Sequence, residues 1–238
     1  MNLHEFLIVC PLVFLAGFVD AIAGGGGLIS LPAYMFAGIP VHHAIATNKL
    51  SSATGTAVST WHLVKSKCVD IFLVPGANLA LIISDKVLKT VLVFVLPVVA
   101  FCVLRDKDLK PVIPEGFTRK KQYLIMAACS FVIGIYDGFY GPGTGTFLLL
   151  AFTKLGKLDM EKATGNVKVV NLTSNISALI TFILAGKILW VLGLSASVFS
   201  IAGHYLGAHM VVKNGVKIIK PIILLVLALL LIKIVLGI

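Results

Sequence analysis

The chain has 238 residues, of which 58% are hydrophobic and 13% charged, with a formal net charge of +10 and a mean hydropathy of +1.03. Soluble domains average about 45–50% apolar and about 25% charged residues. The composition therefore excludes an ordinary soluble domain and indicates a multi-pass protein of the lipid bilayer. Its lysines and arginines fall mostly between apolar runs, as in loops that flank a membrane, which favours lipid headgroups over nucleic acid as their partner.

The first apolar run predicts a helix that breaks and resumes. Residues 6–22 are long enough to cross a hydrocarbon core of about 30 Å at about 1.5 Å per residue. We expect the helix to break at Gly24–Gly27, since each glycine destabilises a helix by about 1 kcal/mol relative to alanine, and to resume over 28–36. Residues 42–65 are rich in small side chains, which let membrane helices approach closely, so this helix is expected inside the bundle.

The rest of the chain repeats this plan after a charged stretch. Residues 71–83 are too short to span and 87–104 predict a plain spanning helix, whereas 105–121 carries most charge and two prolines. A second break is expected at Gly141–Gly145. Further helices are predicted over 122–140, 146–152, 163–185, 188–211 and 218–237. The predicted fold is therefore all-α and polytopic, with about eight spans. Its predicted parts are a first membrane repeat (1–104), shortened near 71–84, a linker loop (105–121) and a second membrane repeat (122–238).

The internal repeat is the strongest signal in the sequence. GFVDAIAGGGG and GIYDGFYGPGTGT each place a lone aspartate, Asp20 or Asp137, four residues before a glycine cluster. An ionised carboxylate at the centre of a membrane helix costs about 2.5–3.5 kcal/mol on insertion scales, so two such residues need a reason. Interrupted apolar segments at matching positions of two halves point to a transporter site at the repeat interface. The alternative is a duplication that stabilises a bundle without any transport role.

These motifs also support a family resemblance. FVDAIAGGGGLISLP and ATNKLSSATGT in the first half, with IYDGFYGPGTGTFLLL and TGNVKVVNLTSNISALI in the second, resemble the TauE/SafE family of sulfite and organosulfonate exporters. The resemblance covers nearly the whole chain. It implies a multi-helix permease with a duplicated core that moves small organic or sulfur oxyanions across a bacterial inner membrane.

The glycine breaks predict an anion site. The helix that follows a break presents free N–H groups carrying about half a positive charge, and glycines let an oxyanion approach the backbone. Lysines are candidate counter-charges, and asparagines can donate to or accept from an oxyanion. The predicted substrate-binding residues are Gly24, Gly25, Gly26, Gly27, Asn48, Lys49, Gly141, Gly143, Thr144, Gly145, Asn166, Lys168 and Asn171. Two alternatives stay open: the glycines serve close helix packing, and the lysines snorkel to an interface.

Asp20 and Asp137 have two interpretations. They are either ion-pair partners of Lys49 and Lys168, or groups that carry protons for coupling. The histidines give a weaker signal: His204 and His209 are five residues apart and do not share a helix face as an i, i+4 pair would.

No HExxH, GxSxG or paired-carboxylate arrangement occurs, so the sequence predicts no enzyme, cofactor or metal site. It predicts a secondary transporter for a small anion (a sulfur oxyanion, organosulfonate or organic acid), with proton coupling as a hypothesis. An uncoupled anion channel and a structural or assembly subunit are the alternatives. Cargo, direction and oligomeric state, monomer or homo-oligomer, are not determined by the residues.

Overall fold

A computed structural model describes residues 3–69, 113–139 and 143–236, with the side chains of 134–139 and 233–236 left out. The described residues form eight helices and no strand, which confirms the predicted all-α fold. The segments predicted over 71–83 and 87–104 lie outside the described residues. So do residues 105–112 of the predicted linker, together with its boundary to the first repeat, whereas the last residues of the predicted linker form the start of α5.

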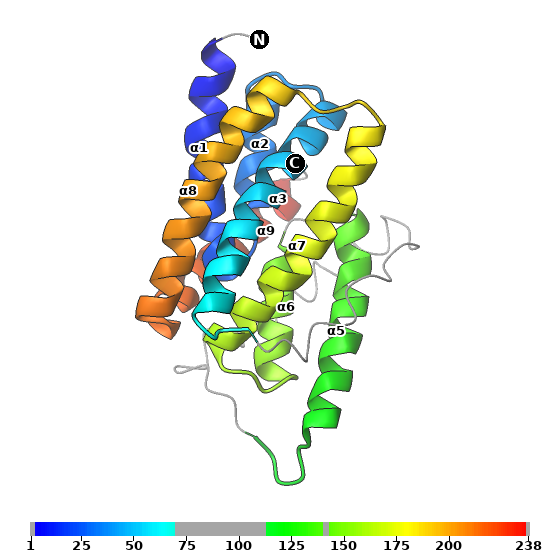
Figure 1. Cartoon of the computed structure of the whole chain (residues 1–238), viewed down its shortest axis with the longest axis vertical. Helices are drawn as coiled ribbons and strands as arrows, with labels where there is room; N and C mark the ends of the chain where they lie inside the picture. The colour runs from blue at the N-terminus through cyan, green and yellow to red at the C-terminus, as the bar shows by residue number, and fades with distance from the viewer. Residues whose placement is uncertain (1–2, 70–112, 140–142, 237–238) are drawn as a thin grey trace.

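The helices run mostly side by side along the long axis of the molecule (Figure 1). They are α1 (Leu3–Ala23), α2 (Gly27–Phe36), α3 (Val41–Lys65), α5 (Arg119–Phe139), α6 (Thr144–Lys154), α7 (Met160–Leu184), α8 (Trp190–Asn214) and α9 (Val216–Leu236). Each begins and ends within three residues of the range expected from the sequence, because apolar run length and glycine or proline punctuation determine these boundaries locally.

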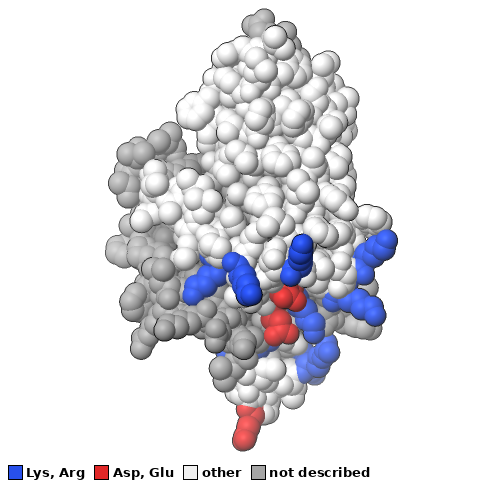
Figure 2. All heavy atoms as spheres, turned by 90° about the vertical axis from the view of Figure 1, so that its left-hand side faces the viewer, with Lys and Arg blue, Asp and Glu red and all other residues white. Residues whose placement is uncertain are grey.

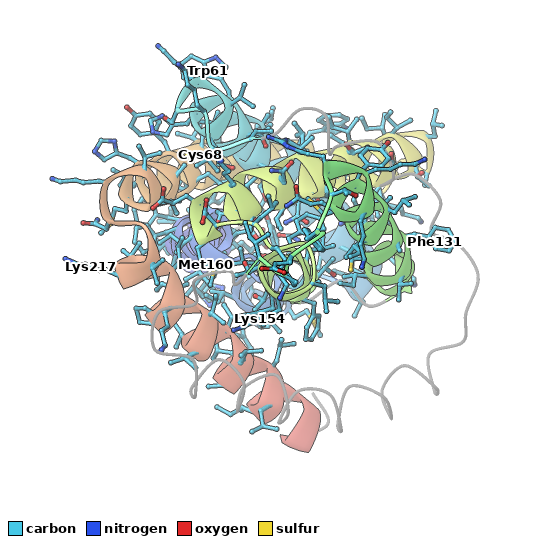
Figure 3. The ribbon with its side chains drawn as sticks, turned by 90° about the horizontal axis from the view of Figure 1, so that it is seen from below. Trp61, Cys68, Phe131, Lys154, Met160 and Lys217 are labelled. Carbon is cyan, nitrogen blue, oxygen red and sulfur yellow. The ribbon has the colours of Figure 1, made fainter. Side chains whose placement is uncertain are left out.

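The exterior suits a bilayer. By length and composition, α1, α7 and α8 are the helices of the described chain able to cross a membrane. On the face shown in Figure 2, the charged side chains gather in the lower part and leave the upper part without Lys, Arg, Asp or Glu. Viewed from below, Trp61 and Phe131 point away from the bundle (Figure 3), and they are 60% and 39% exposed. The predicted number of about eight spans stays a prediction.

Small residues let α1, α3 and α8 approach closely. Gly203 and Gly207 of α8 face the backbone of α1, and a Cβ on Gly207 would lie 2.6 Å from the Phe18 carbonyl oxygen. This is the small-xxx-small spacing of close membrane-helix contacts. α3 packs against both α8 and α7 and buries its small residues Ala46 and Ala53. The expectation that this helix lies inside the bundle is confirmed.

The two helix breaks contact each other across the bundle. α1 ends at Ala23, and Gly24 and Gly25 have φ angles of +70° and +108°, a conformation that favours glycine. A Cβ on Gly145, at the start of α6, would lie 2.7 Å from the Cα atom of Gly24. Thr146 Oγ1 donates to the carbonyl oxygens of Ala23 (2.9 Å) and Gly24 (2.8 Å). The second segment therefore satisfies backbone groups that the first break frees, as membrane depth requires.

Candidate substrate cavity

A cavity of about 360 Å³ lies between α1, α2, α3, α6, α7 and α8. Both glycine breaks reach its wall, as does the first turn of α6. The predicted site residues that line it are Asp20, Gly25, Gly26, Gly27, Asn48, Lys49, Gly143, Thr144, Gly145 and Asn171. Most of the predicted site thus surrounds one space, built from segments more than a hundred residues apart in the chain.

Other predicted residues lie behind this wall. Gly24 packs on Gly145, so for Gly24 the geometry agrees with the close-packing alternative. Asn166 donates through Nδ2 to the Lys162 carbonyl oxygen of its own helix at 2.8 Å. Lys168 is fully buried against Asp20. Gly141 and the side chain of Asp137 lie outside the described residues.

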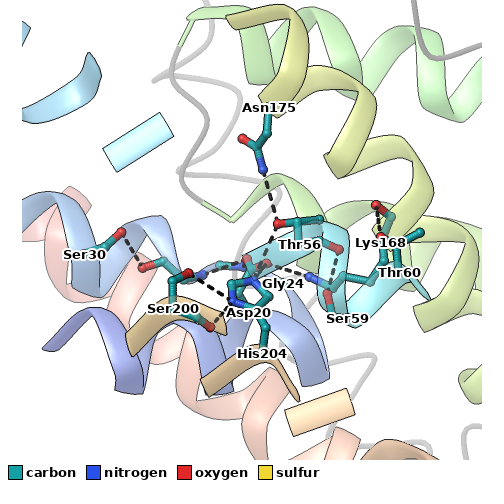
Figure 4. Close-up of polar contacts among 12 residues, drawn as sticks. Asp20, Gly24, Ser30, Thr56, Ser59, Thr60, Lys168, Asn175, Ser200 and His204 are labelled. Carbon is teal, nitrogen blue, oxygen red and sulfur yellow. Dashed lines mark hydrogen bonds and ion pairs between the residues drawn. The ribbon is translucent and has the colours of Figure 1, made fainter. Parts of the chain in front are cut away.

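Asp20 is the centre of a polar cluster (Figure 4). Its Oδ2 lies 2.7 Å from Lys168 Nζ and 3.3 Å from His204 Nε2. Its Oδ1 accepts hydrogen bonds from the backbone N–H groups of Gly25 and Gly26, each at 3.1 Å. These N–H groups stand at the N-terminus of α2, where the sequence predicts an anion. The carboxylate of Asp20 is therefore the anion that the first glycine break holds.

The ion pair of Asp20 joins the two halves of the sequence. Its lysine is Lys168 of α7, whereas Lys49, the lysine nearer in sequence, contacts no carboxylate among the described residues. A buried pair of this kind persists when hydrogen bonds satisfy the remaining lone pairs, as the two glycine N–H groups do here. For Asp20 the geometry therefore matches the ion-pair interpretation.

Lys49 points into the cavity. The residue is half-buried in the N-terminal half of α3, and its Nζ donates to Asn175 Oδ1 of α7 at 3.0 Å. Both residues line the cavity. Since the ammonium group bonds to an interior amide, it does not snorkel to an interface. It supplies a positive charge to the cavity wall.

Asn48 presents an unsatisfied polar atom. The residue is 6% exposed and lines the cavity, and its Oδ1 has no hydrogen-bond partner among the residues that the structure describes. Buried polar atoms are nearly always paired, so each exception needs an explanation. Rotation of the amide exchanges its oxygen and its NH2 group, so the same position can offer an acceptor or a donor to a bound molecule.

The sequence pattern did not predict roles for His204 and Thr56. His204 is 3% exposed and bonds to Asp20, and Thr56 Oγ1 accepts from Asn175 Nδ2 at 3.4 Å. The sequence does contain a signal for His204, because a polar ring in an apolar span is costly unless it faces a polar interior. Asn175 belongs to the asparagines that the sequence offers as hydrogen-bonding groups for an oxyanion, and it lines the cavity.

An apolar helical bundle with a polar interior cavity, lined by paired helix breaks, defines a multi-pass membrane transporter. The family model described as Sulfite exporter TauE/SafE matches residues 9–234. The chain therefore belongs to the TauE/SafE family, as the motif resemblance implied.

Bacterial relatives carry transporter names. The chain is 36% identical to the "Probable membrane transporter protein YfcA" of Escherichia coli (strain K12), a match covering 90% of this chain and 83% of that protein. It is 34% identical to the "Probable membrane transporter protein ORF9" of Sinorhizobium sp, covering 94% and 89%. A "Probable membrane transporter protein" of Haemophilus influenzae is also 34% identical, covering 89% and 87%. No solved structure matches. These relatives fit a multi-pass protein of a bacterial inner membrane.

Proposed function

We propose that the protein is a secondary transporter that binds a small anion in the cavity between its two helix breaks. The anion would be a sulfur oxyanion, an organosulfonate or an organic acid. The observation that carries this proposal is the contrast between the two lysines. Asp20 neutralises Lys168, whereas Lys49 lines the cavity and donates to the amide oxygen of Asn175.

The charge of the cavity wall supports an anion. Since Asp20 and Lys168 cancel, Lys49 leaves one positive charge among these three residues. The N-terminus of α6 at Gly143 and Thr144 adds a partial positive charge of about one half from the helix dipole. The amides of Asn48, Asn171 and Asn175 add hydrogen-bonding groups.

The size and lining of the cavity favour an anion with a short apolar part. Its volume of about 360 Å³ falls within the usual range of small-molecule sites. Val13, Leu31, Ile45 and Phe182 add apolar groups to the wall. An organosulfonate or a short organic acid can contact both kinds of group, whereas sulfite has no apolar part.

Thermal denaturation of the detergent-purified chain with sulfite, methanesulfonate and acetate tests this site. A ligand that binds the folded state stabilises it by RT ln(1 + [L]/Kd), about 2.7 kcal/mol at a hundredfold excess over Kd. We expect a shift in wild type that Lys49→Ala abolishes. Lys213→Ala, at an exposed lysine of α8, is the control and should keep it. An undiminished shift in Lys49→Ala would contradict the proposed site.

Proton coupling is the second part of the proposal, supported by the titratable groups of Asp20 and His204 in the cavity wall. Flux of the bound anion into proteoliposomes separates the alternatives. A coupled transporter accumulates the anion in response to a proton gradient, and a channel follows voltage alone. A structural subunit gives no flux, and its Lys49→Ala variant differs in no assay.

A further inference from the structure

We infer that His204 is the proton-binding group of the cavity. A hydrogen-bond chain through Thr56 and Asn175 then links the protonation of His204 to the binding of an anion by Lys49. This inference rests on the proposed anion site and adds the residue through which a proton would act. It assigns a role to a histidine that the composition and motifs left without one.

The ring of His204 is held in a fixed orientation. His204 Nδ1 lies 2.9 Å from the Ser200 carbonyl oxygen and 3.3 Å from Ser200 Oγ. A Cβ on Gly17 would lie 2.6 Å from the same nitrogen, and one on Gly55 would collide with it. The ring therefore occupies a slot between α1 and α3 that is open because residues 17 and 55 are glycines.

The partners of the ring determine where its protons sit. A carbonyl oxygen only accepts, so the 2.9 Å contact favours a hydrogen on Nδ1 that is donated to Ser200. His204 Nε2 faces Asp20 Oδ2 at 3.3 Å and Thr56 Oγ1 at 3.5 Å. When Nε2 is protonated it donates to the carboxylate. When it is not, its lone pair faces the carboxylate unfavourably and can accept instead from the Thr56 hydroxyl.

A chain of hydrogen bonds connects the protonation state of His204 Nε2 to the proposed anion site. Thr56 Oγ1 accepts from Asn175 Nδ2 at 3.4 Å, and Asn175 Oδ1 accepts from Lys49 Nζ at 3.0 Å. With neutral His204, the Thr56 hydroxyl donates to the ring, so the chain runs in one direction from Lys49 to Nε2. When His204 is protonated, Nε2 can no longer accept the hydrogen bond from Thr56. When an anion binds, Lys49 can donate to it in place of Asn175. Each event therefore breaks one end of the same hydrogen-bond chain.

The charges of the cluster also favour simultaneous binding of the anion and the proton. The titratable groups that meet His204 among the described residues are Asp20 of α1 and, through the shared Oδ2, Lys168 of α7. α3 contributes Thr56, and α8 itself Ser200. Because Asp20 and Lys168 cancel, a proton on His204 adds a second positive charge to that of Lys49. The anion and the proton therefore stabilise each other in the cavity.

Nuclear magnetic resonance of the full chain in detergent, with ¹⁵N-labelled histidine, tests His204 without any cargo. Spectra recorded at about pH 8 and about pH 5.5 should show, for the signal missing in His204→Gln, a hydrogen on Nδ1, the nitrogen that faces the Ser200 carbonyl oxygen. A ring protonated at Nε2 alone would overturn the inference.

Binding of methanesulfonate, which keeps its charge at both pH values, tests the coupling. We expect wild type to bind it about tenfold more tightly at the lower pH, a typical size for coupled sites. His204→Gln should lose this difference, and so should Thr56→Val, which retains the histidine. His209→Gln, on the same helix beside His62, should keep it. A pH dependence retained in Thr56→Val would overturn the chain.

The two tests separate the two ideas. If wild type binds none of the anions but Nδ1 of His204 carries the hydrogen, the proposed cargo is wrong and the arrangement inferred for His204 stands. If anions bind through Lys49 with no pH dependence, the anion site stands and the inference fails.

Discussion

Lys168 of α7 lies with Nζ 2.7 Å from Oδ2 of Asp20 of α1, and this ion pair connects the first glycine-broken segment to a helix of the second half of the chain. Lys168 is fully buried and the Asp20 side chain is 18% exposed. The pair therefore places an α7 residue behind the first helix break. It holds the carboxylate against the N-terminus of α2, where Gly25 and Gly26 donate to it.

Lys168→Met should lower the free energy of unfolding by about 3–5 kcal/mol, because it leaves a buried carboxylate without its counter-charge. Adding Asp20→Asn should restore part of this loss. Thermal or denaturant unfolding in detergent of wild type, both single variants and the double variant measures the coupling energy. Additive effects of the two substitutions would show that the pair contributes no coupling.

Thr146→Val should destabilise the fold by about 1–3 kcal/mol, because it removes the donor to two buried carbonyl oxygens at the first break. Thr173→Val is the matched control, since in the described part of the chain the Thr173 hydroxyl bonds only to the Val169 carbonyl oxygen of its own helix. We expect the control to change stability by less than about 0.5 kcal/mol. Unfolding in detergent compares the two, and equal losses would contradict a role for Thr146 in joining the breaks.

Gly145→Ala should disrupt the crossing of the breaks. The new methyl group would lie 2.7 Å from the Cα atom of Gly24, a backbone atom that cannot move away cheaply. Gly27→Ala is the control for folding, because a Cβ there meets nothing within 4 Å and alanine favours a helix by about 1 kcal/mol over glycine. The yield and melting temperature of purified protein should fall for Gly145→Ala and hold for Gly27→Ala. A stable Gly145→Ala protein would show that the two breaks can separate.

Gly55→Ala should push His204 out of its slot and remove the pH dependence of methanesulfonate binding. The added methyl group would collide with both the His204 ring and Ser200 Oγ. Gly193→Ala in α8 is the control. Its added methyl group would lie 2.8 Å from a flexible Leu50 methyl group, so it disturbs packing between α3 and α8 without contacting His204. Binding at about pH 5.5 and about pH 8 compares them. A Gly55→Ala protein that folds and keeps the pH dependence would contradict the slot.

The sequence by itself determined the class of protein, the helices and the residues worth examining. Apolar runs, glycine clusters and prolines act locally, so the described helices begin and end where the pattern predicts. A carboxylate or a lysine in an apolar span is costly wherever the helix packs. For this reason the sequence pattern alone identifies Asp20, Lys49 and Lys168 as candidate functional residues.

Only the tertiary structure decided which of these groups meet. The repeat pattern treats Lys49 and Lys168 as equivalents, but helix packing brings Lys168 to Asp20 and Lys49 to Asn175. His204 joins the cluster because Gly17 and Gly55, on two other helices, leave room for its ring. Partner choice depends on distances between helices far apart in sequence, and local pattern carries no information on those distances. The structure therefore separates a lysine that stabilises the fold from one that faces the cavity.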